Sequence, residues 1–304
     1  MRATPVRLLA TAAAAGLLLT ACGSSDDDAG AAPSASDGVS VVASTNVYGS
    51  IASAIGGDDV DVTSIIDDPS ADPHSFEAST RTQLQVSEAD LLIENGGGYD
   101  DFMQTLVDST ETQATVLNVV DLSGKDADAE GFNEHVWYDF PTVVTLVGEI
   151  VDQLSTIDPD NADTYRSNGD AFTAQVQALI DAEATDEPAT SGAGVAITEP
   201  VPGYLLDALG AANRTPEEFS EAIEEGTDVS PAVLQQTLDL FSSGQVKALV
   251  YNEQTTGAET EQVLQAAEDA GVAVVPVTET LPEGMDYVSW MQSNVDAVAA
   301  ALSR

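Results

Sequence analysis

The sequence predicts an α/β fold with two lobes, each with a small parallel sheet flanked by helices, joined by one long connecting helix. Two observations predict this fold. Strand-like apolar runs alternate with helical patterns in residues 39–157 and again in residues 187–304, and such alternation is typical of parallel sheets. Between these stretches, residues 158–186 carry one helical pattern, which we assign to the connecting helix. A chain of 304 residues is long enough for two such lobes.

The first lobe is expected to contain four strands, because β-branched and apolar residues dominate residues 39–43, 60–66, 89–95 and 115–119. Apolar residues at helical spacing predict the intervening and following helices at residues 47–55, 80–87, 102–107 and 141–154. Glycines mark two of the ends. Gly56 and Gly57 follow the first helix, and residues 96–98 are three glycines that end the third strand.

The connecting helix is expected to begin at Asp158 as its N-cap, with Pro159 at the first helical position, where its missing N–H is not needed. Residues 185–194 contain proline, glycine, serine and threonine and predict a break after it. The second lobe follows, with strands expected at residues 193–198, 246–252 and 272–277. Its helices are expected at residues 201–209, 216–225, 231–241, 259–270 and 285–302.

The N-terminus predicts export and lipid anchoring. Arg2 and Arg7 precede the apolar run 8–19, which has the length of a signal peptide and is too short to span a membrane. The run leads into Leu-Thr-Ala-Cys-Gly, which resembles a bacterial lipobox. We therefore assign residues 1–21 to a lipoprotein signal peptide, Cys22 to lipidation and residues 22–38 to a flexible acidic tether. The alternative is an ordinary secretory signal followed by a cysteine without a role.

The charge of the chain excludes one class of partner. With 52 acidic residues against 8 Lys and Arg, the net charge is −44, and a nucleic-acid backbone would be repelled. The balance is typical of the solvated surface of a protein that works in salt, and it is compatible with a cation as ligand. Cys22 is the only cysteine, so the chain forms no intrachain disulfide.

Histidine is scarce in this chain. His74 and His135 are its only two, so both are candidate ligands of a borderline metal ion. His74, Glu199 and Glu279 come just after expected strands, and ligands of parallel sheets bind beyond the carboxyl ends of the strands. This pattern points to a cleft between the lobes. The alternative is a loop histidine, a half-buried histidine beside Trp137 and two of the many surface acids.

Several segments carry a resemblance to a known family. Residues 72–77 read Asp-Pro-His-Ser-Phe-Glu, residues 134–139 read Glu-His-Val-Trp-Tyr-Asp, and residues 157–161 read Ile-Asp-Pro-Asp-Asn. These segments, with residues 89–96, 247–254 and 279–291, resemble the metal-binding lipoproteins that feed ABC importers of zinc and manganese. The likeness covers residues 39–303.

The resemblance implies a function and a set of ligands. A divalent ion, Zn²⁺ or Mn²⁺, would be captured between the lobes by His74, His135, Glu199 and Glu279 and delivered to an ABC permease in the cytoplasmic membrane. The chain would be a monomer on the extracytoplasmic face of the cell membrane and would not be an enzyme. Two departures stand out: relatives usually have aspartate where this chain has Glu279, and residues 124–132 form a short loop without histidine.

The chemistry of the four side chains agrees with cargo binding. Two imidazoles and two carboxylates nearly neutralise a divalent ion and leave no open position for an activated water. The carboxylates favour manganese, whereas the intrinsic affinity order favours zinc, so we expect both ions to bind. We expect Asp139 or Glu134 either to accept the second ring N–H of His135 or to be an exposed loop acid. We also expect the connecting helix to keep lobe motion modest on binding.

Two other functions remain open from the residues. One is an exported binding protein for an organic solute or a metal chelate, although the chain has few aromatic and arginine side chains to line its cleft. The other is a metal-dependent hydrolase. The sequence contains no Gly-x-Ser-x-Gly, His-Glu-x-x-His or phosphate-binding loop, which disfavours the hydrolase.

Overall fold

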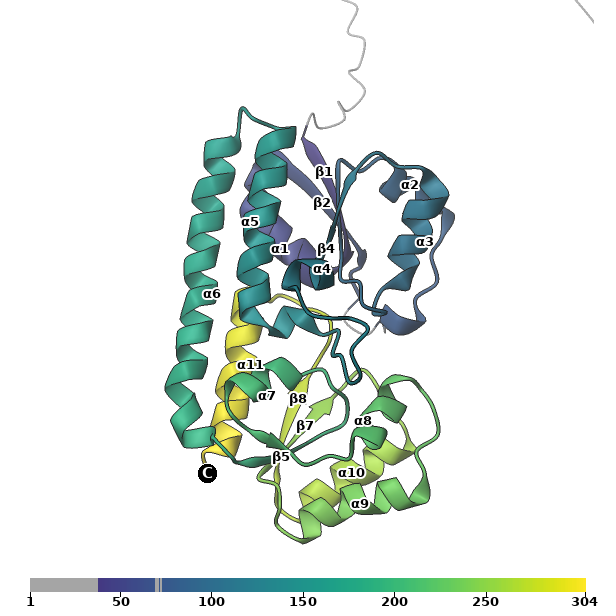
Figure 1. The fold of residues 1–304 in the computed structure, drawn as a ribbon, viewed down its shortest axis with the longest axis vertical. Helices are drawn as coiled ribbons and strands as arrows, with labels where there is room; N and C mark the ends of the chain where they lie inside the picture. Colours follow the sequence, from purple (N-terminus) through teal and green to yellow (C-terminus); the bar gives the residue numbers. More distant parts are fainter. Residues whose placement is uncertain (1–37, 69–70, 72) are drawn as a thin grey trace, which may run out of the picture. The chain divides into compact units, whose positions relative to one another are not determined.

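The structure is a computed structural model that describes residues 38–68, 71 and 73–304 (Figure 1). Residues Gly38–Arg304 form one compact unit. The expected signal peptide, the tether up to residue 37 and the lipidation site at Cys22 lie outside the described residues. Within the described ranges, no helix is both long and apolar enough to cross a membrane.

The first sheet has four parallel strands in the order β2-β1-β3-β4. The strands are β1 (Val39–Thr45), β2 (Val60–Ile66), β3 (Leu91–Glu94) and β4 (Thr115–Asn118). Successive residues of β1 face opposite sides of the sheet, so Val41 and Ala43 pack in the same core as Ile51, whereas Val42 packs with Phe102. Both faces are covered by helices, which explains why the central strands β1 and β3 are largely buried and apolar.

Helices flank this sheet on its two faces. Ile51 belongs to the helix on one face, and Phe102 belongs to one of the two helices beside the other (Figure 1). The elements are α1 (Asn46–Gly56), α2 (Thr80–Ser87), α3 (Asp101–Thr110), α4 (Val119–Ser123) and the short 3-10 turns η1 (Gly57–Asp59), η2 (Pro73–Ser75) and η3 (Val136–Tyr138). Of these turns, η2 contains His74, and His135 immediately precedes η3.

The second sheet repeats the arrangement, with parallel strands in the order β6-β5-β7-β8. The strands are β5 (Gly194–Ile197), β6 (Ala212–Asn213), β7 (Ala248–Asn252) and β8 (Ala273–Val277). The helices are α7 (Gly203–Ala208), α8 (Glu217–Glu224), α9 (Pro231–Ser242) and α10 (Ala258–Asp269). Val250 of β7 lies in the large core shared with the first sheet, and Leu249 lies in a second core with Phe219 and Phe241. The α/β prediction with two small parallel sheets is confirmed.

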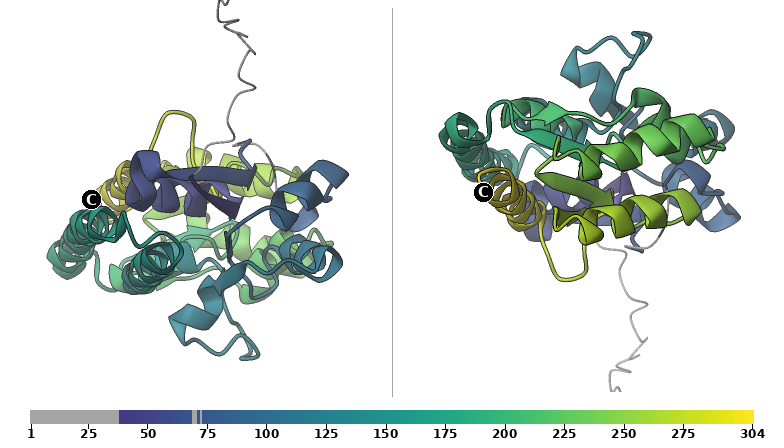
Figure 2. Two further views of the ribbon diagram at one scale, coloured as in Figure 1. Left: turned by 90° about the horizontal axis from the view of Figure 1, so that it is seen from above. Right: turned by 90° about the horizontal axis from the view of Figure 1, so that it is seen from below.

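Three longer helices lie together at one side of this unit: α5 (Phe140–Ile157), α6 (Ala162–Thr190) and α11 (Tyr287–Leu302) (Figure 2). Helix α5 lies beside the first sheet and α11 beside the second, and α6 runs along both (Figure 1). The connecting helix α6 packs against α1, α5 and α11. Its buried residues Tyr165, Phe172, Val176 and Leu179 recur at helical spacing, so one face of α6 closes the core of both sheets. At Gly169 a Cβ would lie 2.4 Å from Cγ2 of a valine on α5, so only glycine permits this close approach of the two helices.

The predicted ends of the connecting helix are wrong. It begins at Ala162, because Asp158 does not cap it and instead accepts hydrogen bonds from the side chains of Asn161 and Tyr165, each 2.8 Å long. It also continues to Thr190, through the expected break. Pro188 lies in the last turn, where its missing N–H removes a single helical hydrogen bond, and the buried Thr190 hydroxyl donates to the Leu209 carbonyl at 2.6 Å.

Candidate metal centre

Three of the four expected ligands lie on connections that directly follow strands, and His135 lies on the segment that follows β4 and α4. His74 lies in η2, on the connection after β2, and His135 immediately precedes η3. Glu199 follows β5, and Glu279 follows β8. Because the carboxyl ends of parallel strands share one edge of a sheet, these connections bring side chains from both sheets to one place.

The structure brings His74, His135 and Glu279 together. One ligand atom from each of these residues lies within 4.8 Å of the other two. The distance from His74 Nε2 to Glu279 Oε2 is 3.9 Å, and the two imidazole centroids are 6.5 Å apart. The His135 side chain is fully buried, whereas that of His74 is 24% exposed. We call these three residues the inner trio; it is closed on the His135 side and partly open on the His74 side.

Glu199 lies beside the inner trio without belonging to it. It is buried, and its Oε2 accepts a hydrogen bond from Nδ2 of Asn252. The same Nδ2 donates to Glu279 Oε1 at 2.8 Å. One side-chain amide at the end of β7 therefore holds both carboxylates of the second sheet next to each other, where their mutual repulsion is offset by the shared donor.

The side chain of Gln254 positions the loop that carries Glu279. Its Oε1 accepts a hydrogen bond from the Glu279 backbone N–H at 2.5 Å. Its Nε2 donates to Thr280 Oγ1 at 2.9 Å and to the Ala71 carbonyl at 3.1 Å. Ala71 belongs to the connection that carries His74, so Gln254 links a ligand loop of the second sheet to one of the first.

The orientation of His135 is set by Asn133. The distance between His135 Nδ1 and Asn133 Oδ1 is 2.7 Å, and Asn133 Oδ1 also accepts from the His135 backbone N–H at 3.0 Å. Since Asn133 Nδ2 donates to the Pro200 carbonyl at 2.9 Å, its oxygen is the atom that faces the imidazole. Nδ1 therefore carries the proton, and Nε2 presents a lone pair, the arrangement that a metal-ligating histidine requires.

The expectation that Asp139 or Glu134 accepts the second ring N–H of His135 is wrong. Asp139 is held elsewhere, because Lys125 Nζ lies 3.1 Å from Asp139 Oδ2 and Thr142 Oγ1 donates to the same oxygen at 2.5 Å. The neutral amide of Asn133 takes the position expected for a carboxylate. This choice leaves His135 a neutral ligand without an additional negative charge behind it.

Aromatic rings pack beside both imidazoles. The His135 ring centroid is 5.1 Å from that of Trp137 and 5.8 Å from that of Tyr99, and the His74 centroid is 5.1 Å from Tyr99. Burial lowers the pKa of His135 well below its usual value, and the neighbouring His74 lowers it further. At neutral pH His135 is therefore unprotonated and able to bind a metal ion.

Comparison with known proteins agrees with this geometry. Residues 41–301 match the family model of the zinc-uptake complex component A, periplasmic (ZnuA). The chain belongs to this family. The manganese-binding lipoprotein MntA of Halalkalibacterium halodurans is 27% identical over 302 residues, which cover 95% of each chain. The manganese ABC transporter substrate-binding lipoprotein PsaA of Streptococcus mitis is 25% identical over 307 residues, covering 95% of this chain and 96% of that one.

Solved structures of similar fold extend the comparison. The periplasmic zinc-binding protein TroA of Treponema pallidum superposes with a TM-score of 0.74 at 18% identity, covering 88% of this chain and all of that one. This likeness confirms the two-lobe fold. The family assignment and the fold thus agree with the resemblance that the motifs predict, and the names of the relatives are those of substrate-binding proteins rather than enzymes.

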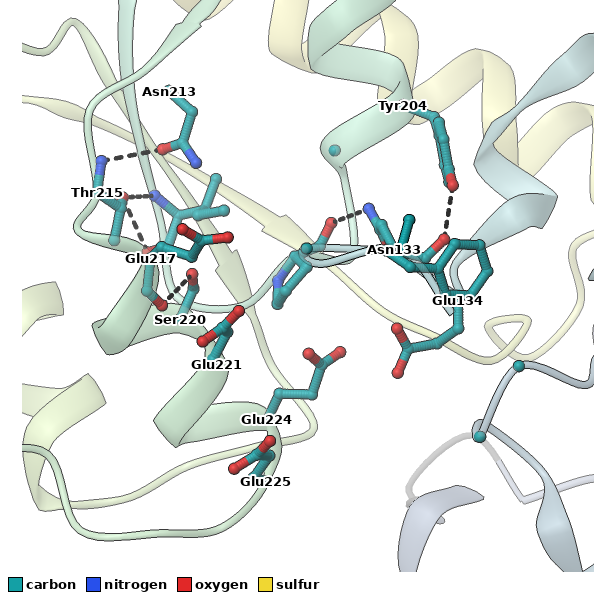
Figure 3. A pocket seen from close by; sticks show the side chains of 18 of the residues that line it. Asn133, Glu134, Tyr204, Asn213, Thr215, Glu217, Ser220, Glu221, Glu224 and Glu225 are labelled. Carbon is teal, nitrogen blue, oxygen red and sulfur yellow. Dashed lines mark hydrogen bonds between the residues drawn. The ribbon is translucent and has the colours of Figure 1, made fainter. Parts of the chain in front are cut away.

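A cavity of about 900 Å³ opens beside the inner trio. His74 contributes to its wall. Asn133 and Tyr204 also line it (Figure 3). The rest of the wall is rich in carboxylates, which come from Glu134, Asp207, Glu217, Glu221, Glu224 and Glu225. The cavity is therefore suited to cations and repels anionic ligands.

Glu224, at the end of α8, is the member of this wall that the sequence analysis missed. Its Oε1 lies 3.4 Å from His135 Nε2. Burial, with a smaller contribution from the carboxylates of Glu134, Glu199 and Glu279, raises the pKa of Glu224 to about 9. A divalent ion would reverse this repulsion, because it supplies the positive charge that the neighbouring groups lack.

Proposed function

We propose that this protein is an extracytoplasmic substrate-binding lipoprotein that captures a divalent transition metal ion between its two sheets and delivers it to an ABC importer. The observation that carries the proposal is the inner trio. Two imidazoles from the first sheet and a carboxylate from the second place their ligand atoms close to one another. A site divided between two sheets suits capture and release, since each half contributes part of the coordination.

The ligand set that we propose is His74, His135, Glu199 and Glu279. Glu199 completes it because Asn252 already holds its carboxylate beside that of Glu279. Two nitrogen and two carboxylate ligands fit Zn²⁺ and Mn²⁺, and the four protein ligands leave no position for a reacting water. The acid-lined cavity favours the bare cation as cargo over an anionic chelate.

We propose the same organisation of the whole chain that the sequence predicts. Residues 1–21 are the signal peptide and 22–38 the tether, and lipid on Cys22 anchors the protein at the extracytoplasmic face of the membrane. Residues 39–157 form the first lobe, helix α6 with its corrected bounds Ala162–Thr190 is the connection, and the second lobe follows it. The relatives MntA and PsaA, both named lipoproteins, support this anchoring, and the name of PsaA as an ABC transporter protein supports a permease as partner. We propose that the protein acts as a monomer.

Metal titration by calorimetry tests the proposal. With residues 38–304, the compact unit, we expect one tight site for both Zn²⁺ and Mn²⁺. His74→Ala, His135→Ala, Glu199→Gln and Glu279→Gln should each weaken the site. Glu253→Gln, an exposed neighbour of Asn252, is the matched control and should bind as the wild type does. Tight binding that survives loss of both histidines would refute the proposed site.

A further inference from the structure

A second group of ligand atoms lies on the cavity side of the inner trio. His74, Glu134 and Glu224 each place one ligand atom within 4.8 Å of the other two. Glu134 and Glu224 come from opposite walls of the cavity, from the segment before η3 and from α8, and their carboxylates point toward each other (Figure 3). We call these three residues the outer trio.

Independent evidence for a ligand lies at the boundary between the two trios. His135 is fully buried, and its Nε2 has no hydrogen-bond partner among the described residues. The buried Oε1 of Glu224 likewise has none, although it lies only 3.4 Å from that Nε2. Buried polar atoms are nearly always paired, so two facing ligand atoms that both lack a hydrogen bond point to a positive ion as the partner of both.

We propose that Glu134, Glu224 and His74 form a second divalent-cation subsite, at which the ion binds before it reaches the inner trio. This inference rests on the proposed function. A neutral imidazole offers a single lone pair, so His74 serves one ion at a time and the two trios are occupied in succession. Glu224 then stands between them, since it belongs to the outer trio and faces the inner ligand His135.

The subsite has a kinetic consequence. Carboxylates at the cavity wall raise the local concentration of a cation, and a subsite that holds the ion also supplies it at a short distance from its final ligands. Replacing either glutamate by glutamine keeps its size and removes the carboxylate that would bind the ion. We therefore expect the association of Mn²⁺ to slow by about tenfold or more in Glu134→Gln and Glu224→Gln. Tight binding at the inner trio should persist in both variants.

Stopped-flow fluorescence measures this step. Trp137 lies beside His135, with ring centroids 5.1 Å apart, and reports arrival of the ion at the inner trio. Glu225→Gln is the matched control, because it makes the same replacement at the adjacent residue of the same cavity and lies outside the outer trio. Equal association rates in Glu224→Gln and Glu225→Gln would overturn the proposal, and so would complete loss of tight binding in Glu224→Gln, which would make Glu224 an inner ligand.

A second measurement isolates the subsite at equilibrium. In His135→Ala the inner trio is broken, and we expect a weaker Mn²⁺ site to remain, seen as loss of the paramagnetic resonance signal of free Mn²⁺. Adding Glu224→Gln should abolish this residual site, whereas adding Glu225→Gln should leave it. Residual binding that is absent, or indifferent to Glu224, refutes the subsite alone. Absence of a tight site in the wild type refutes the proposed function itself, so the two failures are distinguishable.

Discussion

Asn46 and Leu281 join the two sheets through a reciprocal pair of hydrogen bonds. Asn46 Nδ2 donates to the Leu281 carbonyl at 3.1 Å, and Asn46 Oδ1 accepts from the Leu281 N–H at 2.8 Å. Asn46 is the first residue of α1, directly after β1, and Leu281 lies two residues beyond Glu279. The amide of one side chain thus fixes the loop that carries a proposed ligand from the other sheet.

Replacing this amide should weaken both the fold and the site. In Asn46→Ala the Leu281 N–H and carbonyl lose their partners, so we expect the free energy of unfolding to fall by about 1–3 kcal/mol and metal affinity to fall with it. Asn168→Ala is the matched control, because it also removes a side-chain bond to a backbone carbonyl, that of Ile55, away from the candidate site. Urea unfolding and calorimetry on both variants should show lost stability in each but lost affinity only in Asn46→Ala.

The same pair bears on motion between the sheets. Asn46, Asn133 and Gln254 each make hydrogen bonds that join a loop of one sheet to a loop of the other. Together with the rigid packing of α6, these bonds predict only a small change in the radius of gyration when the metal binds. Solution scattering with and without Zn²⁺ tests this prediction, and a large compaction would contradict it.

Asn133 offers a sharper test of how His135 is oriented. Asn133→Ala removes the acceptor that holds the proton on His135 Nδ1, and we expect metal affinity to fall by about 10–100-fold. Asn133→Asp restores an acceptor at the same position and should recover most of that loss. The tautomer of His135, read from nitrogen chemical shifts, should change in the alanine variant only. Equal affinity in all three proteins would show that Asn133 does not position the ligand.

The sequence was sufficient to find the candidate ligands that stand out chemically. His74 and His135 are rare residues in this chain, and Glu279 follows a strand whose end is readable from its β-branched run. Glu224 does not stand out, because it is one of five glutamates in and after α8. The one sequence feature that could have indicated Glu224 is its position four residues after Ser220. This spacing places it at the edge of the buried face of the helix.

Tertiary contacts explain what the sequence did not predict. Asp139 was a reasonable partner for His135 by proximity, but one of the few lysines, Lys125, holds it. Asp158 has the residue type of a helix cap, yet the hydroxyl of Tyr165 and the amide of Asn161 claim its carboxylate. In both cases another side chain binds the carboxylate oxygen that the predicted role required. The residue type of the aspartate alone does not reveal this competing partner.

Metal binding should raise the free energy of unfolding by an amount set by the dissociation constant of the ion and its free concentration. At a free ion concentration about 100 times the dissociation constant, ligand linkage adds about 2.7 kcal/mol to the free energy of unfolding. Chelation should remove this gain, and His135→Ala should show a smaller gain at the same ion concentration. Chemical denaturation with and without Mn²⁺ measures it. A gain that is equal in the wild type and in His135→Ala would place the stabilising ion elsewhere.

Glu183 predicts a pH dependence that is separate from the metal. It lies on the inner face of α6, 6% exposed, and its Oε1 has no hydrogen-bond partner among the described residues. Burial, with a smaller contribution from Asp139, raises its pKa from an ordinary value of 4.5 to about 8. Between these two pH values the folded protein keeps a proton that the unfolded chain has released. The free energy of unfolding therefore falls as the pH rises through this window.

Replacing Glu183 by glutamine should remove this dependence. The amide has the shape of the protonated acid and never ionises, so Glu183→Gln should match the wild type near pH 4.5 and exceed its stability above pH 8 by about 1–3 kcal/mol. Asp170→Asn, an exposed carboxylate on the same helix, is the control and should leave the pH profile unchanged. Urea unfolding across this range, without metal, gives the comparison. Parallel profiles for Glu183→Gln and the wild type would mean that Glu183 is already ionised in the folded protein at neutral pH, with water reaching its carboxylate.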